Sequence, residues 1–389
     1  MTRLARRSHL PVDGQRIAVV SSGFADGPAQ PLVRFFSENG VADVIFVSHP
    51  LTGEGPAEHR VDRYLAGVRQ PQIVHARPNR PPFTYAFDPI TPLHLPRVDT
   101  WIGFNCLATA QGLARRRVGL VQRVVHWNVD FVPDRFGNRM LNRLYTSLDR
   151  ACCTRSNSRV ELSQAALESR VQAYAMDPHG CPVEVIPMGT WIDAAPKATA
   201  LNLDAPRVVF LGHLVERMGV PLLLDALAIL VERGISLAAD IVGGGPLLAD
   251  LDRQCAGRGL SELVTRHGFV ADFDDVAKIL SRACIAVAPY QVDETSFSRF
   301  ADPGKLKAYL GAALPILLTD VPPNAQELAQ LGGAEILPDD AVAFANAIQG
   351  LLQNRQEWLR RHAAAQLYAQ RFDWGHMFSH ALPRLGISM

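Results

Sequence analysis

The chain has 389 residues, about two to three times the usual domain size, so two domains are expected. Its 39 basic and 38 acidic residues leave a net charge of +1, which argues against a broad nucleic-acid surface or a strongly basic membrane-binding protein. With 48% hydrophobic residues, the chain has ample material for a core, and disorder as its main state is excluded.

Short apolar runs alternate with helical patterns through the first half of the chain. Such runs, each followed by a turn-rich or polar segment, are typical of buried strands in a parallel sheet. The expected strands are 17–20, 44–47, 74–75, 100–102 and 124–127, and the expected helices are 29–39, 106–116 and 138–151. This alternation predicts an α/β domain with helices on both faces of its sheet.

The second half repeats the alternation more clearly. The expected strands are 208–211, 237–242, 264–267, 285–288, 316–318 and 334–337, and the expected helices are 220–233, 247–256, 274–281 and 304–312, with 341–372 mostly helical. A stretch containing proline and glycine, 183–206, separates the halves. We therefore expect two facing, doubly wound Rossmann-like domains with a ligand site in the cleft between them.

The six cysteines show no spacing typical of a zinc site, and their scatter fits reduced, buried thiols. No apolar stretch is long enough for a signal peptide or a membrane span. A cytoplasmic protein without a bound metal is the resulting expectation.

Two glycine-containing loops follow strands of the second half. Residues 212–219 follow the strand 208–211, and residues 243–245 follow the strand 237–242. Backbone N–H groups in such loops and at the following helix suit a diphosphate, but the glycine placement alone favours ordinary βα turns. The order of glycines typical of dinucleotide-binding domains is absent, which disfavours NAD.

Lysine is rare in this chain, with 35 of the 39 basic residues being arginine. Pro303 and Gly304 fit a loop at a helix start, which puts Lys305 in the first turn of that helix. A positive charge there opposes the helix dipole, so an anion at the same place would explain it. Lys307 is a weaker candidate, and both lysines could simply solvate the helix.

Taken together, these motifs resemble those of the retaining, family 4-like glycosyltransferases of the GT-B fold, over about half the chain. The segments that carry the resemblance are 185–189, 212–219, 242–246, 267–270, 302–315 and 371–374. The resemblance implies an acceptor-binding domain over 1–197, a donor-binding domain over 198–370, and a C-terminal helix over 371–389 that packs back on the first domain.

The resemblance also implies donor-binding residues in the second domain: Gly212, His213, Arg217, Gly244, Phe269, Asp302, Gly304, Lys305 and Leu306. The sequence departs from the family pattern at His213, Met218 and Ala308, where the family usually has arginine, lysine and glutamate. Arg217 could supply the lost charge or point to solvent. The family's glutamate pair is not reproduced, and Glu294 or Asp293 is the candidate to reach the sugar.

The first domain offers candidates after its expected strands. His126 and Asp130 are catalytic candidates, together with Glu294 of the second domain. Ser22, Gly23, Asn105 and Asn128 are the acceptor-binding candidates. A core histidine explains His126 equally well, and a structural turn explains Ser22 and Gly23.

The resulting hypothesis is transfer of a sugar from a UDP- or GDP-linked donor to a small-molecule or natural-product acceptor, with retention of anomeric configuration and without a cofactor. The alternatives are a nucleotide-sugar epimerase or phosphorylase on the same fold, and a binding or accessory protein that has lost catalysis. A homodimer is left open.

Overall fold

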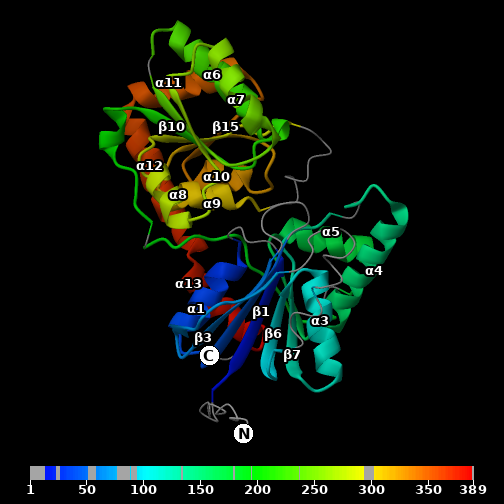
Figure 1. Ribbon diagram of the computed structural model, residues 1–389. Coiled ribbons are helices and arrows are strands. Elements are labelled where there is room, and N and C mark those ends of the chain that lie inside the picture. Colours follow the sequence, from blue (N-terminus) through cyan, green and yellow to red (C-terminus); the bar gives the residue numbers. More distant parts are fainter. Residues whose placement is uncertain are drawn as a thin grey trace. The chain divides into compact units, whose positions relative to one another are not determined.

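The computed structural model describes residues 14–22, 27–50, 58–76, 88, 94–132, 135–177, 180–193, 195–235, 237–292 and 302–387. The chain forms two compact units (Figure 1). Unit 1 comprises residues 1–161, 167–186 and 378–389, and unit 2 comprises residues 162–166 and 187–377. The chain thus enters unit 2 earlier than the sequence-based boundary at 197, and it returns to unit 1 at Phe378.

A nine-stranded sheet in the described residues forms the centre of unit 1, in the order β4-β3-β2-β1-β6-β7-β8-β9, with β5 paired to β3. Its parallel part consists of β1 (Arg16–Ser22), β2 (Asp43–His49), β6 (Val98–Phe104), β7 (Val121–Trp127), β8 (Ser158–Glu161) and β9 (Val183–Val185). Its antiparallel edge consists of β3 (Glu58–Leu65), β4 (Val68–Arg69) and β5 (Ile73–Ala76).

The antiparallel edge corrects one prediction. Residues 74–75 were expected to form a buried parallel strand, but β5 pairs antiparallel with β3 and is largely exposed. The apolar pair Ile73 and Val74 caused the error, because two neighbouring apolar residues do not distinguish a buried strand from an exposed edge strand. The strand β3, whose first six residues include only one apolar residue, Val61, was not expected.

Before the C-terminal segment, four helices of the described residues lie wholly or mainly in unit 1: α1 (Ala29–Glu38), α3 (Cys106–Arg117), α4 (Arg139–Arg155) and α5 (Gln164–Tyr174). The helix α1 packs on β1 and β2, α3 packs on β6 and β7, and α4 packs on α3. The helix α13 (Trp374–Arg384) carries the chain back to unit 1 and lies beside α1 (Figure 1). There the fully buried Phe378 makes edge-to-face contacts with Phe35 of α1 and Trp127 of β7. Aromatic side chains thus fix the C-terminal segment in the core of unit 1.

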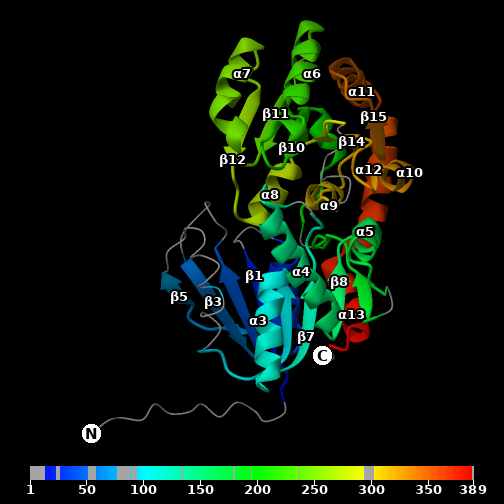
Figure 2. The ribbon, with the colours of Figure 1, turned by 90° about the vertical axis from the view of Figure 1, so that its right-hand side faces the viewer.

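Unit 2 contains a six-stranded parallel sheet in the order β12-β11-β10-β13-β14-β15, and Figure 2 shows this progression from β12 to β15. The strands are β10 (Arg207–Leu211), β11 (Ala238–Val242), β12 (Val264–Gly268), β13 (Ile285–Ala288), β14 (Ile316–Thr319) and β15 (Ala334–Leu337). The strand order reverses beside β10, which in doubly wound sheets marks the place where ligands bind.

The helices of unit 2 are α6 (Val220–Glu232), α7 (Leu251–Gly257), α8 (Phe273–Leu280), α9 (Gly304–Gly311), α10 (Ala325–Leu331), α11 (Ala341–Gln353) and α12 (Arg355–Ala369). The expected helix over 247–256 is divided into a 3-10 turn, Pro246–Asp250, and α7, because Pro246 opens the segment. The helix α10 was not expected. The predicted α/β class with two Rossmann-like sheets is confirmed.

Within the described residues, no helix combines the length and the apolar character that crossing a membrane requires.

Candidate functional site

Two glycine loops lie against each other at the carboxyl ends of β10 and β11. The N–H of Gly212 donates to the carbonyl of Val242 at 3.0 Å, and the N–H of Leu214 donates to the carbonyl of Gly244 at 2.8 Å. Gly243 has φ +144°, and a Cβ there would lie 1.9 Å from the carbonyl oxygen of Gly212. The close approach of the two loops therefore requires glycine at position 243.

The loop after β10 leads into α6 through a second constrained glycine. Gly219 has φ +79°, and a Cβ there would lie 1.5 Å from the carbonyl oxygen of Pro289. No side chain caps the N-terminus of α6, whose first turn carries a proline. Backbone N–H groups in this turn are consequently available to a ligand.

Lys305 lies in the first turn of α9, with its ammonium group beside the Gly212 loop. Its Nζ is buried and has no hydrogen-bond acceptor among the described residues. The nearest groups are the rings of Tyr290 and Phe210, whose centroids lie 4.1 and 4.7 Å from Nζ. A Cβ built on Gly212 would lie 3.5 Å from the same atom.

The surroundings of Lys305 disfavour its charge. Burial lowers the pKa of the ammonium group to about 7. The position in the first turn of a helix adds a further unfavourable interaction with the helix dipole. A bound anion would remove both costs, so the arrangement of Lys305, the Gly212 loop and the start of α9 is that of an anion site.

Asp302 and Lys307 form a separate, internal pair. Lys307 is buried, donates to Oδ1 of Asp302, and lies 4.6 Å from the ring of Phe372. Oδ2 of Asp302 accepts from the backbone N–H of Met188 at 2.6 Å. Both oxygens of the proposed donor-binding Asp302 are thus engaged within unit 2, and Lys307 has its own carboxylate partner.

The remaining donor-side candidates differ in exposure. His213 and Arg217 are exposed, and Phe269 is 65% exposed with its Cβ 3.5 Å from the place where a Cβ on Gly244 would lie. Leu306 is fully buried in the core, so only its backbone is available to a ligand. Gly304 is partly buried beside Met188. Glu294 and Asp293 lie outside the described residues.

In unit 1, His126 belongs to a buried polar network. Its Nδ1 lies 2.7 Å from Oγ1 of Thr109, and its Nε2 lies 3.2 Å from Oδ1 of Asp149. Although burial alone would raise the pKa of Asp149, Arg170 and His126 outweigh it and hold that pKa at about 2. His126 is fully buried, with both ring nitrogens in contact with polar atoms, which favours the interpretation as a core histidine.

Asn128 joins the same network. Its Nδ2 donates to Oε1 of Glu161 at 2.9 Å, and Arg170 lies between Glu161 and Asp149. The network connects β7, α4, β8 and α5. Asn128 is buried within this network and is not presented at the surface of the unit.

Other first-unit candidates lie nearer the surface. Asp130 is exposed and forms an ion pair with Arg135 at 2.5 Å. Asn105, with φ +142°, caps α3 through Oδ1 and donates from Nδ2 to Oγ of Ser22 at 3.0 Å. Ser22 and Asn105 therefore form a pair at the carboxyl ends of β1 and β6, where α/β sheets bind ligands. Gly23 lies outside the described residues.

Comparison with known proteins identifies the fold. Residues 205–354 match the family model "Glycosyl transferases group 1". The chain has the GT-B fold of the glycosyltransferases. Sucrose-phosphate synthase from Thermosynechococcus elongatus superposes with a TM-score of 0.69 at 16% identity, over 94% of this chain and 97% of that chain.

Two further GT-B structures agree over most of the chain. HepE from Anabaena, solved in complex with UDP-glucose, has a TM-score of 0.66 at 16% identity, covering 95% of this chain and 99% of that chain. WaaG, a glycosyltransferase involved in lipopolysaccharide biosynthesis, has a TM-score of 0.64 at 16% identity, covering 94% and 98%. At such identities these structures show the fold, and the resemblance inferred from the sequence is confirmed.

A curated relative adds a shorter match. Alpha-D-kanosaminyltransferase from Streptomyces kanamyceticus is 31% identical over 91 residues, which is 23% of this chain and 23% of that protein. Together with the family match, it favours a glycosyltransferase over an epimerase or a phosphorylase.

The sequence did not reveal the aromatic walls around Lys305. Phe210 belongs to β10 and Tyr290 follows β13, and the parallel pairing of these strands brings the two rings together. A signal was present in the chain, since Tyr290 directly follows an apolar strand and a proline.

Proposed function

We propose that the protein is a glycosyltransferase that uses a nucleotide diphosphate sugar, with the diphosphate held by unit 2. The observation that carries the proposal is the buried ammonium group of Lys305, which has no acceptor among the described residues and faces the Gly212 loop. The group 1 family match over 205–354 and the UDP complexes of HepE support this interpretation.

The chemistry requires stabilisation of the leaving nucleoside diphosphate, on which negative charge develops as the bond to the sugar breaks. Lys305 would supply positive charge, and the backbone N–H groups at the start of α6 would supply hydrogen bonds. Because Nζ is buried and lies over two aromatic rings, its interaction with phosphate oxygens would occur in a poorly solvated place, where it is stronger than in water.

The proposal also includes transfer with retention of anomeric configuration and an acceptor that is a small molecule or a natural product. Retention rests on the family resemblance alone. The relative named for transfer of a kanosaminyl group supports a sugar donor but does not define the acceptor of this chain. The proposed donor is linked to UDP or GDP. The proposed catalytic carboxylate is that of Asp130 or Glu294, and the proposed acceptor contacts are Ser22 and Asn105. The cytoplasmic location and a homodimer stay predictions.

Substitution of Lys305 by alanine tests the diphosphate role. We expect UDP or GDP to bind about 10- to 100-fold more weakly, which corresponds to about 1.4–2.8 kcal/mol, with a parallel loss of sugar transfer. Isothermal titration calorimetry and turnover of UDP- and GDP-sugars provide the measurements.

Lys278→Ala is the matched control, because Lys278 is an exposed lysine of the same unit that pairs with Asp275 on its own helix. Unchanged nucleotide affinity and turnover in Lys305→Ala would refute the assignment. Nucleotide binding by the wild type without transfer to any acceptor tested would instead support the binding-protein alternative, for which the buried Ala308 at the family's glutamate position is the specific observation.

A further inference from the structure

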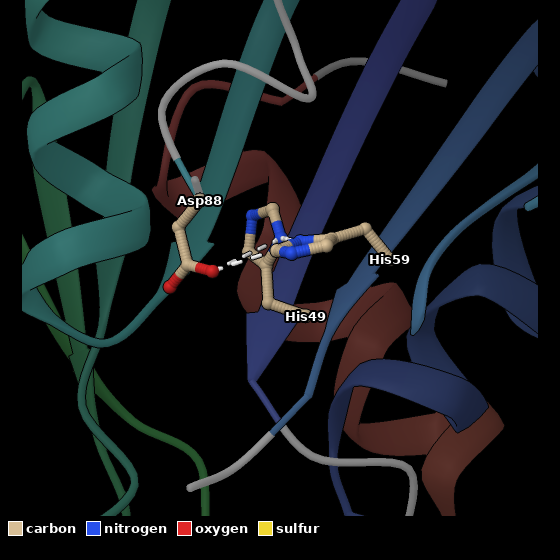
Figure 3. A group of neighbouring side chains, drawn as sticks. All are labelled: His49, His59 and Asp88. Carbon is tan, nitrogen blue, oxygen red and sulfur yellow. Dashed lines mark hydrogen bonds and ion pairs between the residues drawn. The ribbon is translucent and has the colours of Figure 1, made fainter. Parts of the chain in front are cut away.

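Three side chains of unit 1 converge in its interior, and one of them, His49, is paired in the sheet with Ser22. His49 ends β2, His59 lies on the neighbouring antiparallel strand β3, and Asp88 comes from a later part of the chain. Figure 3 shows both imidazole rings and the Asp88 carboxylate turned toward one another. The three residues are 1%, 0% and 2% exposed. We call them the His49 cluster.

The ligand atoms of the cluster form a compact triangle. Nδ1 of His49 lies 2.9 Å from Nδ1 of His59, and Oδ1 of Asp88 lies 3.7 Å from the first nitrogen and 3.6 Å from the second. In a four-coordinate zinc site with bonds of about 2.0–2.1 Å, neighbouring ligand atoms lie about 3.3 Å apart. The observed edges lie on both sides of this value, so small side-chain movements would place all three atoms around one ion.

Within the described residues, the cluster without an ion leaves one carboxylate oxygen of Asp88 without a hydrogen-bond donor. A proton shared between the two Nδ1 atoms makes a single hydrogen bond, and neither nitrogen lies within hydrogen-bond distance of Asp88. Oδ1 of Asp88 is buried and has no hydrogen-bond partner among the described residues. A buried carboxylate oxygen without a donor or a cation is costly, and an ion between the three atoms would compensate it.

A second residue fits the same interpretation. Gln111 of α3 is buried, with its amide nitrogen 3.5 Å from Nε2 of His49 and its amide oxygen without a hydrogen-bond partner in the described part of the chain. When Nδ1 of a histidine binds a metal, Nε2 carries the proton and needs an acceptor. Rotation of the Gln111 amide by half a turn would present its oxygen to Nε2 of His49 and satisfy both groups.

We propose that His49, His59 and Asp88 bind a zinc ion that joins the end of β2 to β3 and to Asp88. Two imidazole nitrogens and one carboxylate oxygen form a donor set that zinc accepts, with a fourth position left for another ligand. The zinc ion is a structural element of unit 1, and its presence does not depend on the proposed glycosyltransferase activity. The absence of zinc-type cysteine spacing in the sequence does not bear on it, because this site contains no cysteine.

The test uses the full chain. Elemental analysis of the purified protein is expected to give one zinc per chain. After removal of metal with EDTA, titration with Zn²⁺ alone is expected to show one tight site and to raise the unfolding temperature. Gln111→Leu should weaken zinc binding about 10- to 100-fold, and Asp88→Asn, which keeps the side-chain shape, should weaken it further. His380→Ala, which alters an exposed histidine of the same unit, should bind zinc as the wild type does.

The proposal would be overturned if the wild type bound no zinc, or if Asp88→Asn bound zinc as tightly as the wild type does. His49 and His59 would then be a pair of histidines joined by a shared proton. Circular dichroism shows whether the buried variants fold. If they do not, zinc-edge X-ray absorption of the wild type decides. Two imidazoles and a carboxylate at about 2.0–2.1 Å support the site, and a shell without imidazole refutes it.

Discussion

Lys305 shows how a single residue connects the sequence to the proposed activity. Its ammonium group is held between two aromatic rings with no acceptor among the described residues, so its charge is costly until an anion is bound. The protonation state of Lys305 and the occupancy of the anion site are therefore linked.

Nucleotide affinity should depend on pH. Burial lowers the pKa of Lys305 to about 7 in the free protein, and a bound diphosphate would raise it, so binding takes up a proton above that pH. We expect UDP affinity to fall between about pH 7 and pH 9, by at most about tenfold per pH unit. Calorimetry across this range measures the effect. Lys305→Arg, which stays protonated, serves as the comparison and should show little dependence, whereas a flat profile in the wild type would contradict the linkage.

Lys305→Met should stabilise the protein while it removes nucleotide binding. The substitution keeps an unbranched side chain between Tyr290 and Phe210 but removes a buried charge that lacks an acceptor, which we expect to gain about 1–3 kcal/mol of unfolding free energy near pH 7. Because the folded-state pKa of Lys305 lies below its ordinary value of 10.5, the gain should shrink as the pH rises from about 7 toward 10.5. Chemical denaturation at two pH values measures it, and a destabilised Lys305→Met variant would contradict the prediction.

At this scale the sequence predicted some residues better than others. Lys305 could be found because lysine is rare here and its place in a first helical turn is unfavourable. The partners of Asp302 could not be foreseen in full, since the N–H of Met188 comes from a distant segment. The His49 cluster was missed for the same reason, because β3 and its antiparallel pairing with β2 were not expected.

The two glycine loops after β10 and β11 pack so closely that they restrict which residues can occupy them. Their backbones approach so closely that Gly243 cannot carry a side chain without displacing Gly212. The sequence indicated both loops, because glycines directly follow apolar strands. It did not indicate their mutual contact, which arises from the parallel pairing of β10 with β11.

Gly243→Ala should destabilise unit 2 by about 2–4 kcal/mol and weaken nucleotide binding, because the new Cβ would lie 1.9 Å from the carbonyl oxygen of Gly212 at φ +144°. Gly350→Ala is the control. Gly350 lies inside α11, where a Cβ meets nothing within 4 Å, and we expect a gain of about 0.5–1 kcal/mol. Thermal and urea unfolding measure both. Equal stability of Gly243→Ala and the wild type would show that the loops can separate without cost.

On the scale of the whole molecule, each unit has its own sheet and its own buried core. The alternation of strands and helices predicted this organisation. The return of the C-terminal segment to unit 1 was expected from the family resemblance, and not from the alternation, because it depends on contacts between residues far apart in the sequence. Oγ of Ser158 and the guanidinium of Arg123 both donate to the carbonyl of Leu385, at 3.1 and 3.2 Å. These bonds tie the end of the chain to β7 and β8.

Phe378→Ala should therefore destabilise unit 1 although it lies near the C-terminus. The fully buried ring contacts Phe35 and Trp127, and its removal from such a core typically costs about 3–5 kcal/mol. Native-state hydrogen exchange should show faster exchange in β1, β6 and β7, with the strands of unit 2 unchanged. Leu367→Ala, at a 76% exposed position, should alter stability by no more than about 0.5 kcal/mol. Equal loss of protection in both sheets would show instead that the two units unfold as a single cooperative body.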